Sequence, residues 1–140
     1  RKEINKTSRL IEALINRNKE YDYLQIALSY LFIGEYQKSL DFHQKGWEIK
    51  RHPSSLGSQG QVYLEMGEFK KAIEKYTLAV DDKTDAEKSY RKSANASYYS
   101  ERAVAYEKLG KLVNAKADRQ KSLKLKKELG LVTVHIDRVQ

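Results

Sequence analysis

The sequence predicts an all-α protein, built as a solenoid of three helical hairpins that follow an N-terminal helix. Three observations lead to this prediction: the composition, a sequence word that recurs three times, and small residues at matching places in each copy. Hydrophobic residues make up 40% of the 140 residues and charged residues 33%, with one proline and seven glycines. This mixture is too apolar for a disordered chain and too poor in turn residues for an all-β sandwich.

The recurring word consists of a tyrosine, an apolar stretch, a glycine and the start of a second apolar run. It occupies residues 30–36, 63–69 and 106–112, so that its glycines, Gly34, Gly67 and Gly110, are 33 and 43 residues apart. We expect each glycine to adopt the left-handed conformation that closes a helix. Because a second helix would begin within one or two residues, the word predicts three hairpins.

Two antiparallel helices can pack tightly only where their side chains are small. At seven residues before each glycine, and again at five and twelve residues after it, every copy has alanine, glycine or serine. These residues are Ala27, Gly60 and Ala103, then Ser39, Ala72 and Ala115, then Gly46, Ala79 and Ser122. The tyrosine four residues before each glycine is expected to pack between hairpins.

This arrangement resembles the tetratricopeptide repeat, a motif of about 34 residues with Trp, Leu, Gly, Tyr, Ala, an aromatic residue, Ala and Pro at set places. The resemblance implies a right-handed αα superhelix with repeats at residues 20–53, 54–86 and 87–130. The terminal proline is missing from all three copies, His43 and Arg119 replace the aromatic residue, and Gln59 and Arg102 replace the leucine. The matching residues are Tyr23, Ile26, Ala27, Tyr30, Ser39, His43 and Gly46; Leu56, Gln59, Gly60, Tyr63, Ala72, Tyr76 and Ala79; and Tyr99, Arg102, Ala103, Tyr106, Ala115, Arg119 and Ser122.

The ten extra residues before the third copy are expected to be helical rather than a loop. Residues 84–87 have the form of a capping box, and Ala86, Tyr90, Ala94 and Tyr98 follow at helical spacing. We therefore expect one long helix over roughly residues 85–109. Lengthened repeats of this kind resemble those of bacterial signalling and sensor proteins.

The two ends of the chain complete the predicted organisation. Residues 1–19 carry apolar residues at helical spacing and predict a helix, either a cap or the remnant of an earlier hairpin. Residues 131–140 are expected to form a C-terminal cap or the start of a following segment, as a strand or a helix. Because the chain begins with Arg1 and shows no signal-peptide pattern, we expect it to begin partway through a longer protein.

The sequence contains no pattern that is typical of catalysis. The absence of cysteine excludes disulfides, thiolate metal sites and cysteine nucleophiles. His43, His52 and His135 share no metal-ligand spacing, and there is no phosphate-binding loop and no nucleophile elbow. We therefore expect no enzymatic activity, no metal and no cofactor, and we expect His43 to be a packing residue. No apolar run approaches the ~20 residues that span a bilayer, and the compartment stays open, with the cytoplasm favoured.

In the repeat family, the first helix of each hairpin lines a concave groove that holds a peptide. The resemblance implies a groove that is apolar in the first hairpin and polar in the other two. Its partner would be a protein or peptide with a hydrophobic anchor near the N-terminal end, unless the N-terminal helix covers the leucines. The residues implied are Tyr21, Leu24, Gln25, Leu28, Leu31 and Phe32, then Ser58, Gln61 and Glu65, then Ser100, Glu101, Val104 and Lys108.

One binding mode of the family is disfavoured by these residues. Co-chaperones that bind the acidic tail of heat-shock chaperones use a clamp of lysine, asparagine and arginine side chains. None of these residue types is retained at the matching positions, which are Leu24, Leu28, Ser58, Ser97 and Glu101.

The positive charge is concentrated near the C-terminal end. The net charge is +8, and residues 111–127 contribute seven basic residues against one acidic residue. A lysine-rich helix face is usually solvated surface; the alternative is an acidic partner, such as a protein patch or, less favoured, a nucleic-acid backbone. The scarcity of aromatic residues there disfavours stacking on single-stranded bases. We therefore predict a protein-interaction module within a larger scaffold or regulatory protein. A bacterial sensor domain and a self-associating homo-oligomer are the alternatives.

Overall fold

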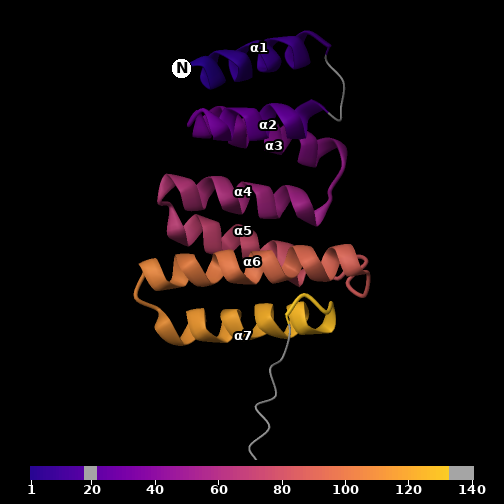
Figure 1. Ribbon diagram of the computed structural model, residues 1–140, viewed down its shortest axis with the longest axis vertical. Helices are drawn as coiled ribbons and strands as arrows, with labels where there is room; N and C mark the ends of the chain where they lie inside the picture. Colours follow the sequence, from indigo (N-terminus) through magenta and orange to yellow (C-terminus); the bar gives the residue numbers. More distant parts are fainter. Residues whose placement is uncertain (18–21, 133–140) are drawn as a thin grey trace, which may run out of the picture.

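The computed structural model describes residues 1–17 and 22–132, which form seven α-helices. Helix α1 (Lys2–Arg17) precedes three antiparallel pairs, and the pairs stack in chain order along the long axis of the molecule (Figure 1). The predicted fold, an all-α solenoid of three hairpins after an N-terminal helix, is confirmed. The pairs are α2 (Asp22–Phe32) with α3 (Tyr36–Ile49), α4 (Pro53–Met66) with α5 (Phe69–Asp81), and α6 (Ser89–Lys108) with α7 (Leu112–Glu128).

Each hairpin closes at the predicted glycine. Gly34, Gly67 and Gly110 have φ angles of 80°, 77° and 74°, in the left-handed region. The residue after each glycine donates its backbone N–H to the carbonyl of the tyrosine that begins the sequence word, which satisfies one of the last helical carbonyls. These bonds run from Glu35 to Tyr30 at 2.9 Å, from Glu68 to Tyr63 at 2.9 Å and from Lys111 to Tyr106 at 2.8 Å.

Two glycines of this fold, Gly67 and Gly46, should respond to alanine in opposite directions. A Cβ atom at Gly67 would have no atom within 4 Å apart from those of Gly67 itself and its chain neighbours, so Gly67→Ala adds only the backbone strain of a positive φ. This strain should lower the free energy of unfolding by about 1 kcal/mol. Gly46 lies inside α3, where an added Cβ would lie at an ordinary 3.8 Å from the Tyr23 Cβ atom. Gly46→Ala should therefore stabilise the fold by up to about 1 kcal/mol through helix propensity. Urea unfolding followed by circular dichroism measures both changes, and a shift of the same sign for both would contradict this assignment.

The small residues lie where the helices touch, and two serines among them also form hydrogen bonds. Ser39 Oγ on α3 donates to the backbone carbonyl of Ala27 on α2 at 2.6 Å. Ser122 Oγ on α7 donates to the carbonyl of Ala96 on α6 at 2.7 Å. A serine therefore replaces alanine at these positions without leaving a buried hydroxyl unpaired.

The start of the third hairpin differs from the prediction. Residues 84–88 form a turn, and α6 begins at Ser89 rather than near residue 85. Asp85 has a positive φ of 54°, which is incompatible with a continuing right-handed helix. The predicted capping box is wrong, because the N–H of Thr84 bonds to the Asp82 side chain at 2.8 Å. The extra residues are thus divided between this turn and a first helix of 20 residues.

A buried arginine holds that turn in place. The side chain of Arg91 is 1% exposed and donates to the backbone carbonyls of Ala79 at 3.2 Å, Asp82 at 2.9 Å and Thr84 at 3.1 Å. Ala79 is in the last turn of α5, and the other two carbonyls lie in the turn that follows it. The guanidinium of Arg91 therefore serves as a C-terminal cap for α5, supplied from the next helix.

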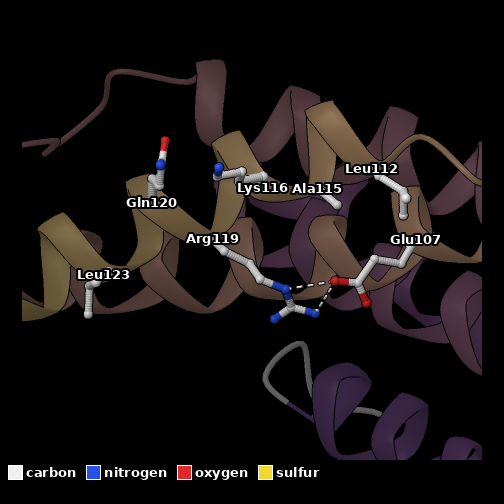
Figure 2. Close-up of a pocket in the computed structure, with 7 residues that line it drawn as sticks. All are labelled: Glu107, Leu112, Ala115, Lys116, Arg119, Gln120 and Leu123. Atoms are coloured by element: carbon white, nitrogen blue, oxygen red, sulfur yellow. Dashed lines mark hydrogen bonds and ion pairs between the residues drawn. The ribbon is translucent and has the colours of Figure 1, made fainter.

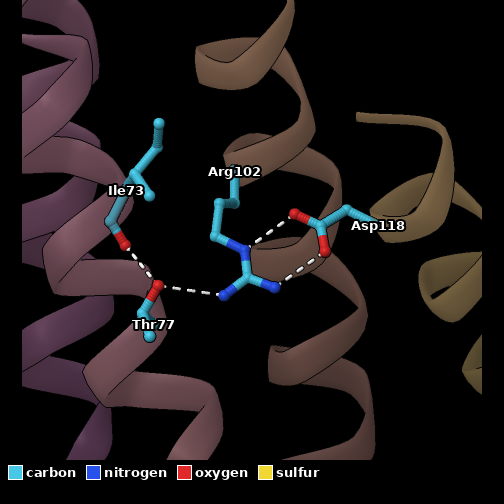
Figure 3. Close-up of polar contacts among 4 residues, drawn as sticks. All are labelled: Ile73, Thr77, Arg102 and Asp118. Carbon is cyan, nitrogen blue, oxygen red and sulfur yellow. Dashed lines mark hydrogen bonds and ion pairs between the residues drawn. The ribbon is translucent and has the colours of Figure 1, made fainter. Parts of the chain in front are cut away.

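A second buried arginine joins three helices (Figure 3). Arg102 on α6 donates from Nε and Nη2 to the two carboxylate oxygens of Asp118 on α7, both at 2.7 Å. Its Nη1 donates to Thr77 Oγ1 on α5 at 3.0 Å, and that hydroxyl donates in turn to the carbonyl of Ile73 at 2.7 Å. Arg102 is 8% exposed and Asp118 is 2% exposed. A charged network therefore fills the place that leucine holds in the repeat motif.

Two further observations concern membrane-spanning helices and the residues outside the described part of the chain. None of the described helices combines the length and the apolar character needed to cross a bilayer. Residues 133–140, which include most of the predicted C-terminal cap, lie outside the described residues, as does Tyr21.

Candidate functional site

The predicted binding residues lie on the first helices of the three hairpins, α2, α4 and α6, and we call the surface that these residues form the groove. Helix α6 lies directly against α4, because a Cβ atom at Gly57 would collide with the ring of Tyr98. Helices α2 and α4 border a shallow, open hollow of about 270 Å³, which we call the α2–α4 hollow. Its lining residues are Leu28, Leu31, Phe32, Gln61 and Glu65.

The structure brings some of the predicted groove residues together and separates others. Leu28, Gln61 and Glu65 share the α2–α4 hollow, whereas Leu24 borders a different hollow of about 430 Å³ together with Ile49 and His52. Tyr21 lies outside the described residues. The remaining residues lie on α2, α4 and α6, where Gln25 and Lys108 are exposed and Ser58, Ser100, Glu101 and Val104 are half-buried.

Helix α1 leaves the apolar part of the groove open. Its buried residues Ile11 and Leu14 form a core cluster with Ile26 of α2. Leu28 remains 37% exposed and Phe32 remains 64% exposed. The alternative that the N-terminal helix covers these residues is therefore wrong, because α1 packs against a different side of α2.

The polar part of the groove has two carboxylates and a buried tyrosine. Glu65 extends from α4 and Glu101 from α6, and neither forms an ion pair within residues 1–17 and 22–132. Tyr76 reaches this region from α5 and is fully buried; its ring lies so close to α4 that a Cβ atom at Gly60 would be 2.9 Å from it. Its hydroxyl has no hydrogen-bond partner of good geometry among the described residues.

Burial and charge act together on these groups. Burial raises the pKa of the Glu101 carboxyl; the nearby Tyr76 hydroxyl opposes this change, and the negative charge of Glu65 adds to it. Burial also raises the pKa of Tyr76, and the neighbouring Glu101 adds to that rise. The three side chains are thus close enough to influence one another. Glu65 and Glu101 could be named from the repeat register, but the approach of Tyr76 from another helix left no sequence signal.

A separate hollow of about 310 Å³ lies at the C-terminal end of the solenoid, on α7 (Figure 2). Arg119 crosses from α7 to Glu107 of α6, with Nε and Nη2 at 2.8 Å and 2.7 Å from the same carboxylate oxygen. Leu112, at 67% exposure, and Leu123, at 42%, lie on its rim. This is the end face of the stack, and it is distinct from the groove.

The histidines and carboxylates of the described residues do not assemble into a metal site, since no group of three or more is close enough to hold an ion. His43 is 3% exposed and lies on α3, where burial lowers its pKa to about 4. This position agrees with the packing role that the sequence predicts for it.

No protein-family model matches the sequence, and no curated protein matches it either. Solved structures are similar in fold. A crystal structure of MamA has a TM-score of 0.75 at 22% identity, covering 90% of this chain and 72% of that one. A second MamA crystal structure has a TM-score of 0.71 at 22% identity, covering 91% and 68%. The second TPR of Spaghetti (RPAP3), bound to the HSP90 peptide SRMEEVD, has a TM-score of 0.63 at 21% identity, covering 81% and 98%. At these identities the likeness establishes the fold alone: the chain is an all-α helical solenoid of the kind that these structures share.

Proposed function

We propose that this chain is a protein-interaction module that binds a segment of another protein in the groove, and that it has no catalytic activity of its own. The observation that carries the proposal is the exposure of Leu28 and Phe32 beside the α2–α4 hollow. Large apolar side chains that remain exposed around a concave site are typical of binding surfaces.

The fold and the groove chemistry give further support. The RPAP3 domain, which has the same fold, is bound to a peptide. That peptide, SRMEEVD, is rich in acidic residues, whereas the groove of this chain contains Glu65 and Glu101 and lacks the basic clamp. We therefore propose the same kind of role, with a partner of different chemistry.

A glutamate in the apolar part of the groove should abolish this binding. We would select binders from a displayed library of random peptides on the immobilised chain, and titrate each one by fluorescence anisotropy. Leu28→Glu places a charge at the α2–α4 hollow, and should weaken binding at least about tenfold. Because Leu28 is 37% exposed, the circular dichroism spectrum should not change.

The matched control is Leu78→Glu on α5, a helix that does not line the groove. Leu78 is 47% exposed, so the same substitution is made at a similarly accessible leucine. This variant should bind as the wild type does. Equal binding by Leu28→Glu and the wild type would contradict the proposal, as would a library that yields no binder.

A further inference from the structure

The hollow on α7 at the C-terminal end of the stack, which we call the end hollow, has a counterpart inside the solenoid (Figure 2). The glycines that close the second and third hairpins, Gly67 and Gly110, are 43 residues apart. With this offset, each residue that lines the end hollow matches a residue of the α4–α5 hairpin. The matching pairs are Leu64 and Glu107, Phe69 and Leu112, Ala72 and Ala115, Ile73 and Lys116, Tyr76 and Arg119, Thr77 and Gln120, and Val80 and Leu123.

On the α4–α5 hairpin, these positions form the surface that helix α6 covers. The rings of Tyr76 and Tyr98 of α6 have their centroids 6.1 Å apart, and Thr77 accepts a hydrogen bond from Arg102 of α6. One hydrophobic cluster joins the two sides and contains Leu64, Phe69, Ala72, Ile73 and Tyr76 together with Tyr98 and Ala105 of α6. The end hollow is the same surface on the last hairpin, so a helix is the element that fits it.

The side chains of the end hollow differ in character from those of its counterpart. Leu112, Ala115 and Leu123 keep an apolar stripe, of which Ala115 is buried and the two leucines are exposed. Other positions that are apolar on the α4–α5 hairpin are charged here, above all Lys116 and Arg119. A helix that covered these charges permanently without pairing them would bury them at a large cost. The end hollow therefore favours a helix that brings opposite charges and binds reversibly.

The charge that remains unpaired around the end hollow is positive. Helix α7 carries six basic residues. Its two acidic residues are already paired, Asp118 with Arg102 at 2.7 Å and Glu128 with Lys92 at 3.7 Å. Lys116 lines the end hollow and forms no ion pair within residues 1–17 and 22–132. A ligand with negative charge is therefore attracted to this end of the stack.

We infer that the end hollow is a second binding surface, separate from the groove, and that it binds an amphipathic helix of another protein with acidic residues beside its apolar stripe. The apolar side chains of that helix cover Leu112, Ala115 and Leu123, and its carboxylates pair with Lys116 and Arg119. Leu112 and Leu123 are about three helical turns apart, so the apolar stripe of the partner extends over roughly 16 Å.

Other occupants match the chemistry of the end hollow less well. In a head-to-tail stack a second copy would present residues 1–17, which contain five basic residues against two acidic ones, so like charges would meet. Residues 133–140 of the same chain contain one acidic and one basic residue. A nucleic acid would pair with the lysines but not cover the leucines, and α7 has no aromatic residue on which a base could stack.

A displayed library of helical peptides tests this inference. Each peptide has leucines along one stripe of about three turns, and random residues at all other positions. The bait is the full chain with Leu28→Glu, so that the groove is disabled. The selected peptides should be enriched in aspartate and glutamate beside the leucines, and depleted of lysine and arginine. A library that yields no binder, or binders without acidic enrichment, would overturn the inference.

Substitutions inside and outside the end hollow locate the binding site of the selected peptides. Leu123→Glu and Lys116→Glu should each weaken binding at least about tenfold in fluorescence anisotropy, since the first adds a charge to the apolar stripe and the second reverses a pairing charge. The matched controls are Leu78→Glu and Lys70→Glu, at an exposed leucine and an exposed lysine of α5. Both controls should bind as the bait does. Equal losses in the controls would mean attraction to net charge alone, and would overturn the inference.

Removing the negative charge on the rim should have the opposite effect. Glu107→Gln should strengthen binding about threefold, because a carboxylate beside the end hollow repels an acidic ligand. Binding that is unchanged or weaker would contradict recognition by charge. A random-sequence DNA duplex that displaces the peptides as well as unlabelled peptide does would mark an unselective anion surface, and would also overturn the inference.

The groove proposal and this inference fail separately. Peptides that require Leu28 should bind the Leu123→Glu variant as tightly as the wild type, because they occupy the groove. A negative result at the end hollow therefore leaves the groove proposal standing.

Discussion

Replacing Asp118 with alanine should lower the free energy of unfolding by about 3 to 5 kcal/mol, because it leaves the guanidinium of Arg102 buried without its counter-charge. Both Arg102 bonds to Asp118 are 2.7 Å long, and the two side chains are almost wholly inaccessible. The network also includes Thr77 of α5, so the change loosens the contact between the second and third hairpins as well as that within the third.

A double-mutant cycle separates this charge effect from simple loss of packing. Arg102→Leu alone should also be strongly destabilising, since it leaves the Asp118 carboxylate buried and unpaired. Arg102→Leu combined with Asp118→Ala should cost clearly less than the sum of the two single changes. The exposed ion pair of the same hairpin gives the matched control: Glu107→Ala removes the partner of Arg119, and should cost less than about 1 kcal/mol. Additive effects at Arg102 and Asp118, measured by urea unfolding, would contradict a coupled pair.

Acidification from about pH 7 to about pH 5 should destabilise the fold by about 2 kcal/mol through His43 alone. Burial lowers the pKa of His43 from its ordinary 6.5 to about 4 in the folded chain. Between these two values the unfolded chain binds a proton that the folded chain does not. Stability is therefore fully present above pH 6.5, and is lost as the pH falls towards 4.

The control for this pH dependence is His43→Phe, which supplies the aromatic residue that the repeat motif has at this position. The variant should have a flatter stability profile over the same pH range. The raised pKa of Glu101 acts in the opposite direction, because a carboxyl of this kind favours the folded state as the pH falls. That contribution is present in both proteins and cancels in their difference. Parallel profiles for the two proteins would contradict the assignment to His43.

The parts of the fold that could be predicted depend on local signals. A glycine with a left-handed backbone is required wherever a helix closes in this way, so Gly34, Gly67 and Gly110 identify the three hairpins directly. Ala27, Ser39 and their counterparts mark helix contacts for an equally local reason, since only a small side chain allows the backbones to approach. The three first helices could accordingly be assigned from the sequence alone.

The features that could not be predicted depend on residues from different helices. Arg102 differs from the leucine of the repeat motif, and its partner Asp118 lies on another helix, so neither residue alone indicates a buried ion pair. Arg91 likewise caps a helix to which it does not belong. The predicted capping box does not form, because Asp85 adopts a positive φ. This backbone conformation depends on the three-dimensional surroundings of the turn and not on the local sequence.

The same reasoning applies to the groove. The repeat register places Leu28, Glu65 and Glu101 on first helices, but it does not tell whether α1 covers them or what lies behind them. The packing of α1 on Ile26 answers the first question, and the buried Tyr76 answers the second. Both answers come from contacts between helices that are separate in the sequence.

The most direct test of the groove as the binding surface is an amide chemical-shift map of the isotope-labelled chain, titrated with a library-selected peptide. The groove account predicts that the largest shifts fall on α2, α4 and α6, around Leu28, Phe32, Glu65 and Glu101. Shifts confined to α7 or to the second helices α3 and α5, with these four residues unmoved, would contradict it.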